Sequence, residues 1–141
     1  MTLIIDAAPL VALGDARDPA HEPVHHVLRS ELGDLVVPAP VSAEVDYLLR
    51  RRGGALAARR FIQDVAAGRF RVEGLTRAEH GLVAELDERY DDLAVGLADL
   101  SVVVLAGRFG TRRVLTFDER DFRTLVPLTN GSFVLLPADA L

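Results

Sequence analysis

Short apolar runs alternate with longer segments of helical periodicity along this chain, and the alternation predicts the fold. The apolar runs are typical of buried strands, bounded by polar and turn-forming residues. The expected strands cover residues 3–5, 35–37, 70–72, 114–117 and 133–136. Strands that alternate with helices predict a central parallel sheet with helices on both faces, a three-layer αβα sandwich of the α/β class.

Helix-capping residues mark where several of the helices are expected to begin and end. Thr76 and Glu79 form a capping box ahead of a helix. Ser42 is expected to cap a helix that runs to Arg52 and stops at the glycines 53–54. The expected helices cover residues 9–13, 24–32, 43–52, 55–67, 77–90 and 96–109.

The length and composition indicate one globular domain over residues 1–141, of which half are hydrophobic. No apolar run reaches the roughly 18 residues of a membrane helix, and no signal peptide is recognisable. We therefore expect a cytoplasmic protein without a membrane partner. Cysteine is absent, which excludes thiol catalysis, and lysine is absent, which excludes a P-loop. The net charge of −5 argues against broad nonspecific nucleic-acid binding but not against an RNA enzyme with a carboxylate metal site.

Three acidic residues occupy positions that the expected fold brings to one edge of the sheet. Asp6 and Asp118 each follow an apolar strand run, and Glu44 lies near the start of the helix after the second strand. Open parallel sheets bind ligands outside the carboxyl ends of their strands, so these side chains are expected at that edge. Taken singly, each has a simpler interpretation, as a helix cap for the aspartates and as an acid in a first helical turn for Glu44.

Asp99 is the most informative acid because nearly every residue around it is apolar. A buried carboxylate without a partner is costly, and a metal ion would explain why it is tolerated. Asp99 is also compatible with a half-exposed first helical turn or with an arginine partner. Four acids at one edge would repel one another without a cation, and hard oxygen ligands select Mg²⁺ or Mn²⁺ rather than zinc. Such ions support in-line phosphoryl displacement.

Four segments together resemble the PIN-domain pattern, most closely that of the VapC-type toxins of bacterial toxin–antitoxin pairs. The segments are the strand ending in Asp6, Val41–Glu44, Leu97–Ser101 and Leu115–Phe122. The resemblance covers essentially the whole chain and implies an endoribonuclease that uses Mg²⁺ or Mn²⁺ to cut RNA such as transfer or ribosomal RNA. One departure is that alanine follows Asp6, where family members often carry a hydroxyl or amide residue.

The same resemblance assigns roles to individual residues. It implies that Asp6, Asp99 and Asp118 hold the metal ion, and that Glu44 completes the catalytic set. It further implies that Thr116 hydrogen-bonds within the acidic site and that Asp121 is an additional acid outside the ligand set.

The resemblance also implies two protein partners, a VapB-type antitoxin and a second copy of the chain. The antitoxin of such pairs often places a basic side chain among the acids, where it offsets their repulsion. The sequence adds a modest indication of a homodimer, because Tyr47, Leu48, Leu56 and Phe61 offer more apolar surface than one small sheet needs. The alternative is that these side chains fill a monomeric core. Tyr47, Leu48 and Phe61 are expected in the core or an interface rather than stacked on bases.

Two further motifs have competing interpretations. The run from His21 to His25 matches the letters of the zinc-protease motif H-E-x-x-H, but Pro23 favours the first turn of a helix. We therefore expect His21 to precede the helix and the histidines to be polar surface residues. Arg50 and Arg51 are expected either to complement the helix dipole in solvent or to contact RNA phosphates.

Two other functions stay open at this point. One is a PIN-like module that binds RNA or a protein without cutting, which would require a degraded acidic set. The other is a metal-dependent phosphatase that acts on small phosphoesters.

Overall fold

Strands and helices alternate along the chain in the computed structural model, which describes residues 1–140. The strands are β1 (Leu3–Ile5), β2 (Leu35–Pro38), β3 (Arg71–Glu73), β4 (Arg113–Leu115) and β5 (Val134–Leu136). The helices are α1 (Ala7–Leu13), α2 (His21–Ser30), α3 (Ala39–Ala66), α4 (Arg77–Arg89), α5 (Leu97–Arg108) and α6 (Glu119–Thr124), with a 3-10 turn, η1 (Asp91–Leu93), before α5. Every expected strand lies within two residues of an observed one.

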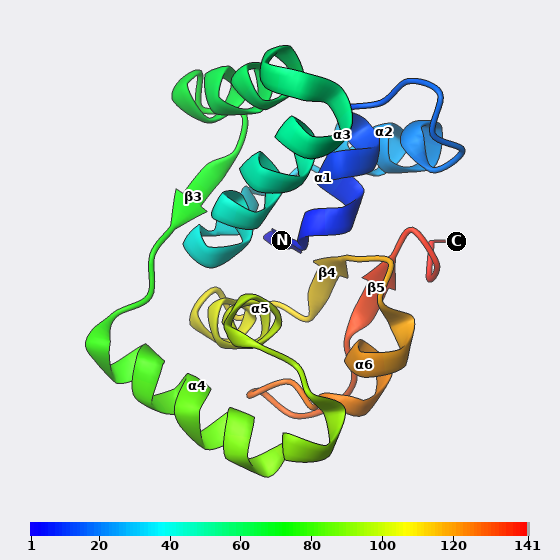
Figure 1. The fold of residues 1–141 in the computed structure, drawn as a ribbon. Coiled ribbons are helices and arrows are strands. Elements are labelled where there is room, and N and C mark those ends of the chain that lie inside the picture. The colour runs from blue at the N-terminus through cyan, green and yellow to red at the C-terminus, as the bar shows by residue number, and fades with distance from the viewer. Residues whose placement is uncertain (141) are drawn as a thin grey trace.

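All five strands of residues 1–140 are parallel and form one sheet with the order β3-β2-β1-β4-β5, whose edge strands β3 and β5 lie on opposite sides of Figure 1. The central strand is β1, in which Ile4 pairs with Val36 of β2 on one side and with Val114 of β4 on the other. The strand order reverses between β1 and β4, and such a reversal is where open parallel sheets bind ligands. The parallel α/β sandwich expected from the sequence is confirmed.

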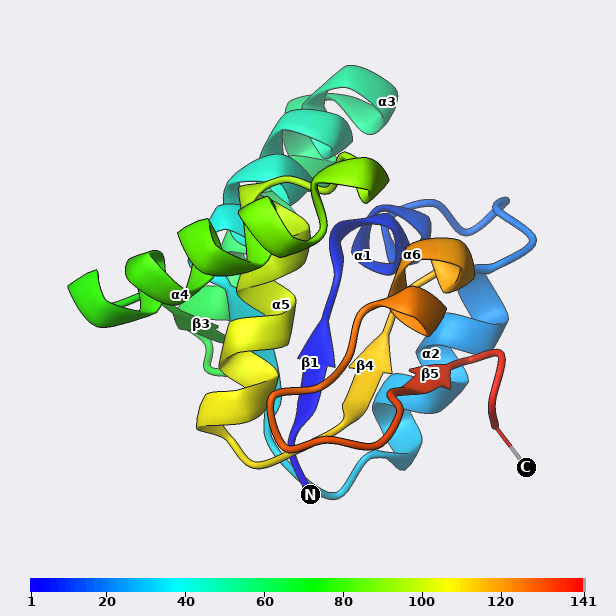
Figure 2. The ribbon, with the colours of Figure 1, turned by 90° about the horizontal axis from the view of Figure 1, so that it is seen from below.

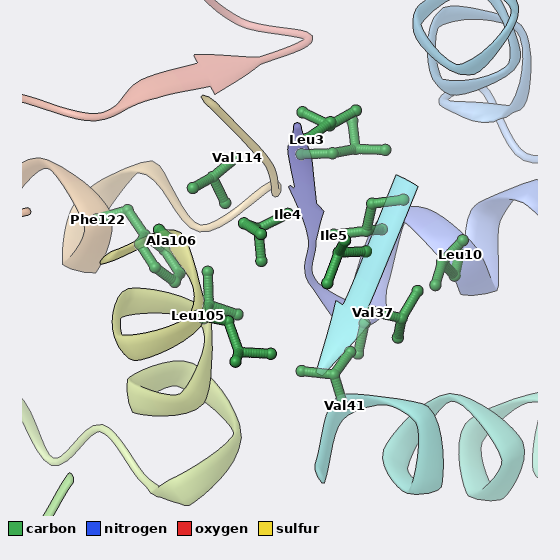
Figure 3. Close-up of a cluster of buried hydrophobic side chains, with 14 of the residues drawn as sticks. Leu3, Ile4, Ile5, Leu10, Val37, Val41, Leu105, Ala106, Val114 and Phe122 are labelled. Carbon is green, nitrogen blue, oxygen red and sulfur yellow. The ribbon is translucent and has the colours of Figure 1, made fainter. Parts of the chain in front are cut away.

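Helices cover both faces of the sheet. One face is covered by α5, which contacts β1, β2 and β4, and α4 packs outside it (Figure 2). In Figure 3, Leu105 of α5 and Leu10 of α1 approach β1 from opposite sides. Every residue from Leu100 to Ala106 is buried, which explains the nearly continuous apolar sequence of α5. Within residues 1–140, no helix combines the length and apolar content needed to cross a membrane.

The long helix α3 is bent where two separate helices were expected. Gly54 has φ of 81° and ψ of −174°, a conformation in which glycine is favoured, and it interrupts the helical backbone at that residue. The expected break at the glycines is therefore present. The expected start is wrong, because the helix begins at Ala39 and the Ser42 hydroxyl donates back to the Ala39 carbonyl at 2.8 Å.

The outer edge of β5 is closed by the turn that follows it. The Leu135 N–H donates to Asp139 Oδ2 at 2.7 Å, and the Asp139 N–H donates to the Leu135 carbonyl at 2.6 Å. Arg123 of α6 donates two further hydrogen bonds to the same carboxylate, at 2.8 and 2.6 Å. The Arg123 guanidinium and the Leu135 N–H lower the pKa of Asp139 to about 2. This turn is therefore anchored to both the sheet and α6.

Candidate active site

Asp6 is the most deeply buried acid of the candidate site, with 8% of its surface exposed. It directly follows β1, and its Oδ1 accepts from the Ala7 N–H at 2.8 Å. Its Oδ2 accepts from the Thr116 hydroxyl, also at 2.8 Å. Burial raises the pKa of Asp6, these two hydrogen bonds offset part of that rise, and the nearby Asp118 carboxylate adds to it. Both carboxylate oxygens are thus held in fixed directions.

Thr116 connects the ends of the two central strands. It follows β4, lies beside Asp6 and is only 1% exposed. Its hydroxyl donates to Asp6 and accepts from the Asp118 N–H at 3.0 Å. Its own N–H donates to the Leu136 carbonyl of β5 at 3.0 Å. The threonine therefore has the hydrogen bond within the acidic site that the sequence led us to expect.

Asp6 and Asp118 are helix caps and members of the acidic cluster at the same time. Asp6 is the N-cap of α1, and Asp118 is the N-cap of α6, where its Oδ1 accepts from the Asp121 N–H at 3.0 Å. The Asp121 carboxyl also lies within hydrogen-bonding reach of the Asp118 carboxylate, which raises the pKa of Asp121. The two interpretations that the sequence set against each other are therefore compatible, because capping occupies one oxygen of each residue.

Asp99 lies half-buried in the first turn of α5. Burial raises its pKa, and the carboxylates of Asp6, Asp118, Glu44 and Asp121 raise it further, to about 7. Within the described residues no arginine forms an ion pair with Asp99. The structure thus brings this acid near the other acids rather than near a basic partner.

Glu44 and Asp121 form the outer part of the cluster. Glu44 lies beyond the first turn of α3, contrary to the prediction, because that helix begins at Ala39. The residue as a whole is exposed, yet partial burial of its carboxylate raises its pKa and the charge of Asp6 raises it further. The pKa of Asp121 is raised by burial and then by the neighbouring Asp118. Glu44 is therefore close enough to Asp6, and Asp121 to Asp118, for their charges to interact.

The donor set suits a hard divalent cation, because every side chain in it is a carboxylate and their charges repel one another. A cation would offset that repulsion. Among residues 1–140, no three histidine or acidic side chains already converge as a finished set of metal ligands. The fit therefore rests on the donor chemistry and on the mutual charge of the acids, not on a closed coordination sphere.

The two arginines expected to contact RNA have different partners. Arg50 donates from Nε to both carboxylate oxygens of Asp46, each at 3.1 Å, so its charge is compensated. Arg51 donates to the Tyr47 hydroxyl at 2.8 Å, and its guanidinium carbon lies 5.6 Å from the centroid of the Tyr47 ring. Tyr47 is 56% exposed, so of the two places expected for it, the core or an interface, the core is excluded. The contact between Tyr47 and Arg51 could have been predicted from the sequence, because residues four apart lie on the same face of a helix.

The histidine motif also differs from expectation. α2 begins at His21, so His21 and His25 lie one helical turn apart, with ring centroids separated by 5.9 Å. Pro23 is accommodated because it still lies in the first turn, where a proline leaves no hydrogen bond unmade. No third histidine or acidic ligand completes a metal site with this pair among residues 1–140. The geometry therefore lacks the third protein ligand of a zinc protease.

Comparisons with known proteins agree with this geometry. A family model described as PIN domain matches residues 3–126, a range that contains all five acids of the candidate site. Over 135 residues the chain is 37% identical to Ribonuclease VapC26 of Mycobacterium tuberculosis (strain ATCC 25618 / H37Rv), covering 96% of this chain and 100% of that protein. The crystal structure of Mycobacterium tuberculosis VapC20, described as a Sarcin-Ricin loop cleaving toxin, matches with a TM-score of 0.77 and 24% identity. That match covers 84% of this chain and 91% of the other.

Proposed function

Because this chain belongs to the PIN-domain family of VapC-type endoribonucleases, we propose that it cuts RNA as the toxin of a toxin–antitoxin pair. Asp6, Asp99 and Asp118 are the proposed ligands of a divalent metal ion, Mg²⁺ or Mn²⁺. Glu44 is the fourth catalytic acid, and Thr116 and Asp121 support the set. The observation that carries the proposal is that Thr116 joins Asp6 and Asp118 at the ends of β1 and β4, with Asp99 close by, where burial and then four neighbouring carboxylates raise its pKa.

The proposed roles of the side chains follow from their burial and their hydrogen bonds. Thr116 fixes Asp6 by donating to its Oδ2, which leaves that carboxylate oriented but still able to share a lone pair with an ion. Asp118 has one oxygen in the α6 cap, and its carboxylate lies within hydrogen-bonding reach of Asp121. Glu44 is the most exposed of the four acids, and its proposed role is to orient an attacking water and accept its proton. When bound, the ion would activate that water and stabilise the charge of the displacement.

A cleavage assay tests these assignments directly. Purified protein is expected to cut structured RNA in Mg²⁺ or Mn²⁺, and a chelator is expected to stop it. Asp6→Asn and Asp99→Asn should abolish cleavage while keeping the fold, because each removes a charge at nearly constant volume. Asp87→Asn, at an exposed position of α4, is the matched control and should cut normally. Full activity in folded Asp99→Asn, with host nuclease excluded, would refute the mechanism.

The proposed substrate is transfer or ribosomal RNA, and the proposed inhibitor is a VapB-type antitoxin. The acidic cluster supports the second proposal, since a basic side chain of a partner would offset the same repulsion that a metal ion does. Co-purification of the chain with the product of the adjacent gene tests it. The complex should form and should cut RNA more slowly than the free chain, and a neighbouring product that neither binds nor inhibits contradicts the assignment.

We also infer a homodimer, on narrower grounds than the sequence suggested. Phe61 is buried and Leu48 packs against the core, so neither offers a free surface. Leu56 is 56% exposed and Ile62 is 47% exposed. Ile62 lines an open pocket of about 400 Å³ beside β3, an edge strand of the sheet. Light scattering should give twice the monomer mass, and a monomer at all concentrations would contradict the inference.

A further inference from the structure

An exposed stripe on α3 runs away from the acidic cluster and is formed by Glu44, Tyr47 and Arg51. All three residues are exposed. Seven residues of α-helix make almost two full turns, so Glu44 and Arg51 lie on nearly the same face, about 10 Å apart along the axis. Tyr47 lies between them. A ligand that reaches Glu44 along this face of the helix therefore meets the tyrosine and the arginine next.

The contact between Tyr47 and Arg51 combines an aromatic face with an available positive charge. The Arg51 guanidinium lies over the ring, with its carbon 5.6 Å from the centroid, and donates to the tyrosine hydroxyl at 2.8 Å. Within residues 1–140, no carboxylate forms a salt bridge with Arg51. The pair orders the tyrosine side chain while leaving more than half of it exposed. An ordered aromatic ring is the type of surface on which an unstacked nucleobase binds.

The neighbouring arginine shows that this arrangement is particular to Arg51. Arg50 is the adjacent residue on the same helix and is also exposed. Its guanidinium is bound to both oxygens of Asp46, so its charge is already compensated. A phosphate on the free Nη groups of Arg50 would share that guanidinium with a carboxylate of like charge, which weakens its binding. At Arg51 it would have to compete only with the tyrosine contact.

We propose that Tyr47 and Arg51 hold an unpaired nucleotide of the RNA next to the bond that is cut, with the base on the tyrosine ring and the phosphate on the guanidinium. The inference rests on the proposed function and specifies its substrate as RNA whose base is unstacked at this position, in a single strand or a loop. A duplex keeps its bases stacked and cannot use the ring. An RNA phosphate complements Arg51, whose charge no carboxylate compensates within residues 1–140, and a second copy of the chain is the competing occupant that the test below separates from RNA.

The test measures RNA binding separately from cleavage, in the Asp99→Asn background with Mg²⁺ present. The probes are a short fluorescein-labelled single-stranded RNA and the same strand in a fully paired duplex. Tyr47→Ala should weaken binding of the single strand by about 5- to 50-fold, because stacking contributes about 1–3 kcal/mol per base. Tyr47→Phe keeps the ring and should stay within about threefold of the parent. Binding of the duplex should change much less in both variants.

The arginines provide a matched pair of variants for the phosphate contact. Arg51→Ala should reduce the salt dependence of binding by about one phosphate contact, and Arg50→Ala should have a clearly smaller effect. Equal effects of Tyr47→Ala on single strand and duplex, or no effect on either, overturn the inference. So does a shift of Tyr47→Ala from dimer to monomer by sedimentation, which assigns the stripe to a second copy.

The proposed function and this inference fail in different ways. If the parent chain cuts and binds RNA while Tyr47→Ala is unchanged, only the inference fails. If the parent chain neither cuts nor binds any RNA, the proposed function is wrong, and the inference, which rests on it, is wrong as well.

Discussion

Replacing Thr116 with valine isolates the hydrogen bonds that hold the buried acid. Valine has nearly the shape of threonine, so it fills the same buried space but carries no hydroxyl. The change removes the donor to Asp6 Oδ2 at 2.8 Å and the acceptor of the Asp118 N–H at 3.0 Å. Asp6 keeps only its bond from the Ala7 N–H.

The two lost bonds set the size of the effect. A hydrogen bond to a charged group contributes about 1.5–3 kcal/mol, and a buried N–H left unpaired costs about 1–3 kcal/mol. Water reaches the half-buried Asp118, so the second cost lies near its lower end, and we expect Thr116→Val to lose about 2–4 kcal/mol of unfolding free energy. Typical domains have about 5–15 kcal/mol, so the variant should still fold. A freed Asp6 carboxylate should lower the cleavage rate by about 10- to 100-fold.

The assay combines urea denaturation with single-turnover cleavage of RNA in Mg²⁺, normalised to folded protein. Thr116→Ser is the control, because it keeps both hydrogen bonds and loses only a methyl group, at a cost of about 1 kcal/mol. Serine should therefore cut at close to the parent rate although it is less stable. A valine variant that matches the parent in both stability and rate would show that the Thr116 hydroxyl does not hold Asp6 in the active arrangement.

Two further predictions concern charge and pH. The bonds from Arg108 lower the pKa of Glu79 to about 2, so their contribution to stability is complete above the ordinary pKa of glutamate and is lost as the pH falls towards 2. Glu79→Gln should therefore lower the unfolding free energy, measured in urea at neutral pH, by about 1 kcal/mol, because solvent screens this part-exposed pair. The difference should vanish in strong acid. An equal loss for Glu85→Gln, at an exposed position, would contradict the assignment. The pKa of Asp99 is raised to about 7, so the metal-free protein should lose stability as the pH rises from about 4 to 7. Asp99→Asn in chelator should be more stable than the parent at pH 8 and should lose that advantage at low pH, and equal stability at pH 8 would count against mutual repulsion in the cluster.

The sequence predicted the features that depend on neighbouring residues. The strands followed from short apolar runs, because a strand between two helical layers must be apolar on both faces. The capping box of Thr76 and Glu79 was predicted correctly because both of its hydrogen bonds are local. The placement of Asp6 and Asp118 followed from the rule that parallel strands end at one edge of the sheet.

Other features could not be predicted from neighbouring residues, because two residues competed to mark the start of a helix or because exposure depends on tertiary packing. Ser42 was chosen as a helix cap, but Pro40 already fits the first turn and moves the start of α3 back to Ala39. Tyr47 was expected in the core or an interface, and its exposure excludes the core. Its exposure depends on which part of α3 the other helices leave uncovered, which residue spacing alone does not determine. Asp99 was singled out from its apolar neighbours in the sequence, but the acids that surround it come from three other parts of the chain, which its neighbouring residues do not reveal.

Because the outer edge of β5 is closed, a strand from another molecule can join the sheet more easily at β3 than at β5. A strand from another molecule joins a sheet by bonding to the free N–H and C=O groups of an edge strand. At β5 both outward groups of Leu135 are bonded to Asp139, which Arg123 holds in place. Strand exchange or fibre-like association through β5 therefore first requires release of this carboxylate, whereas β3 has no such turn bonded along it in residues 1–140. Any intermolecular extension of the sheet should begin at β3.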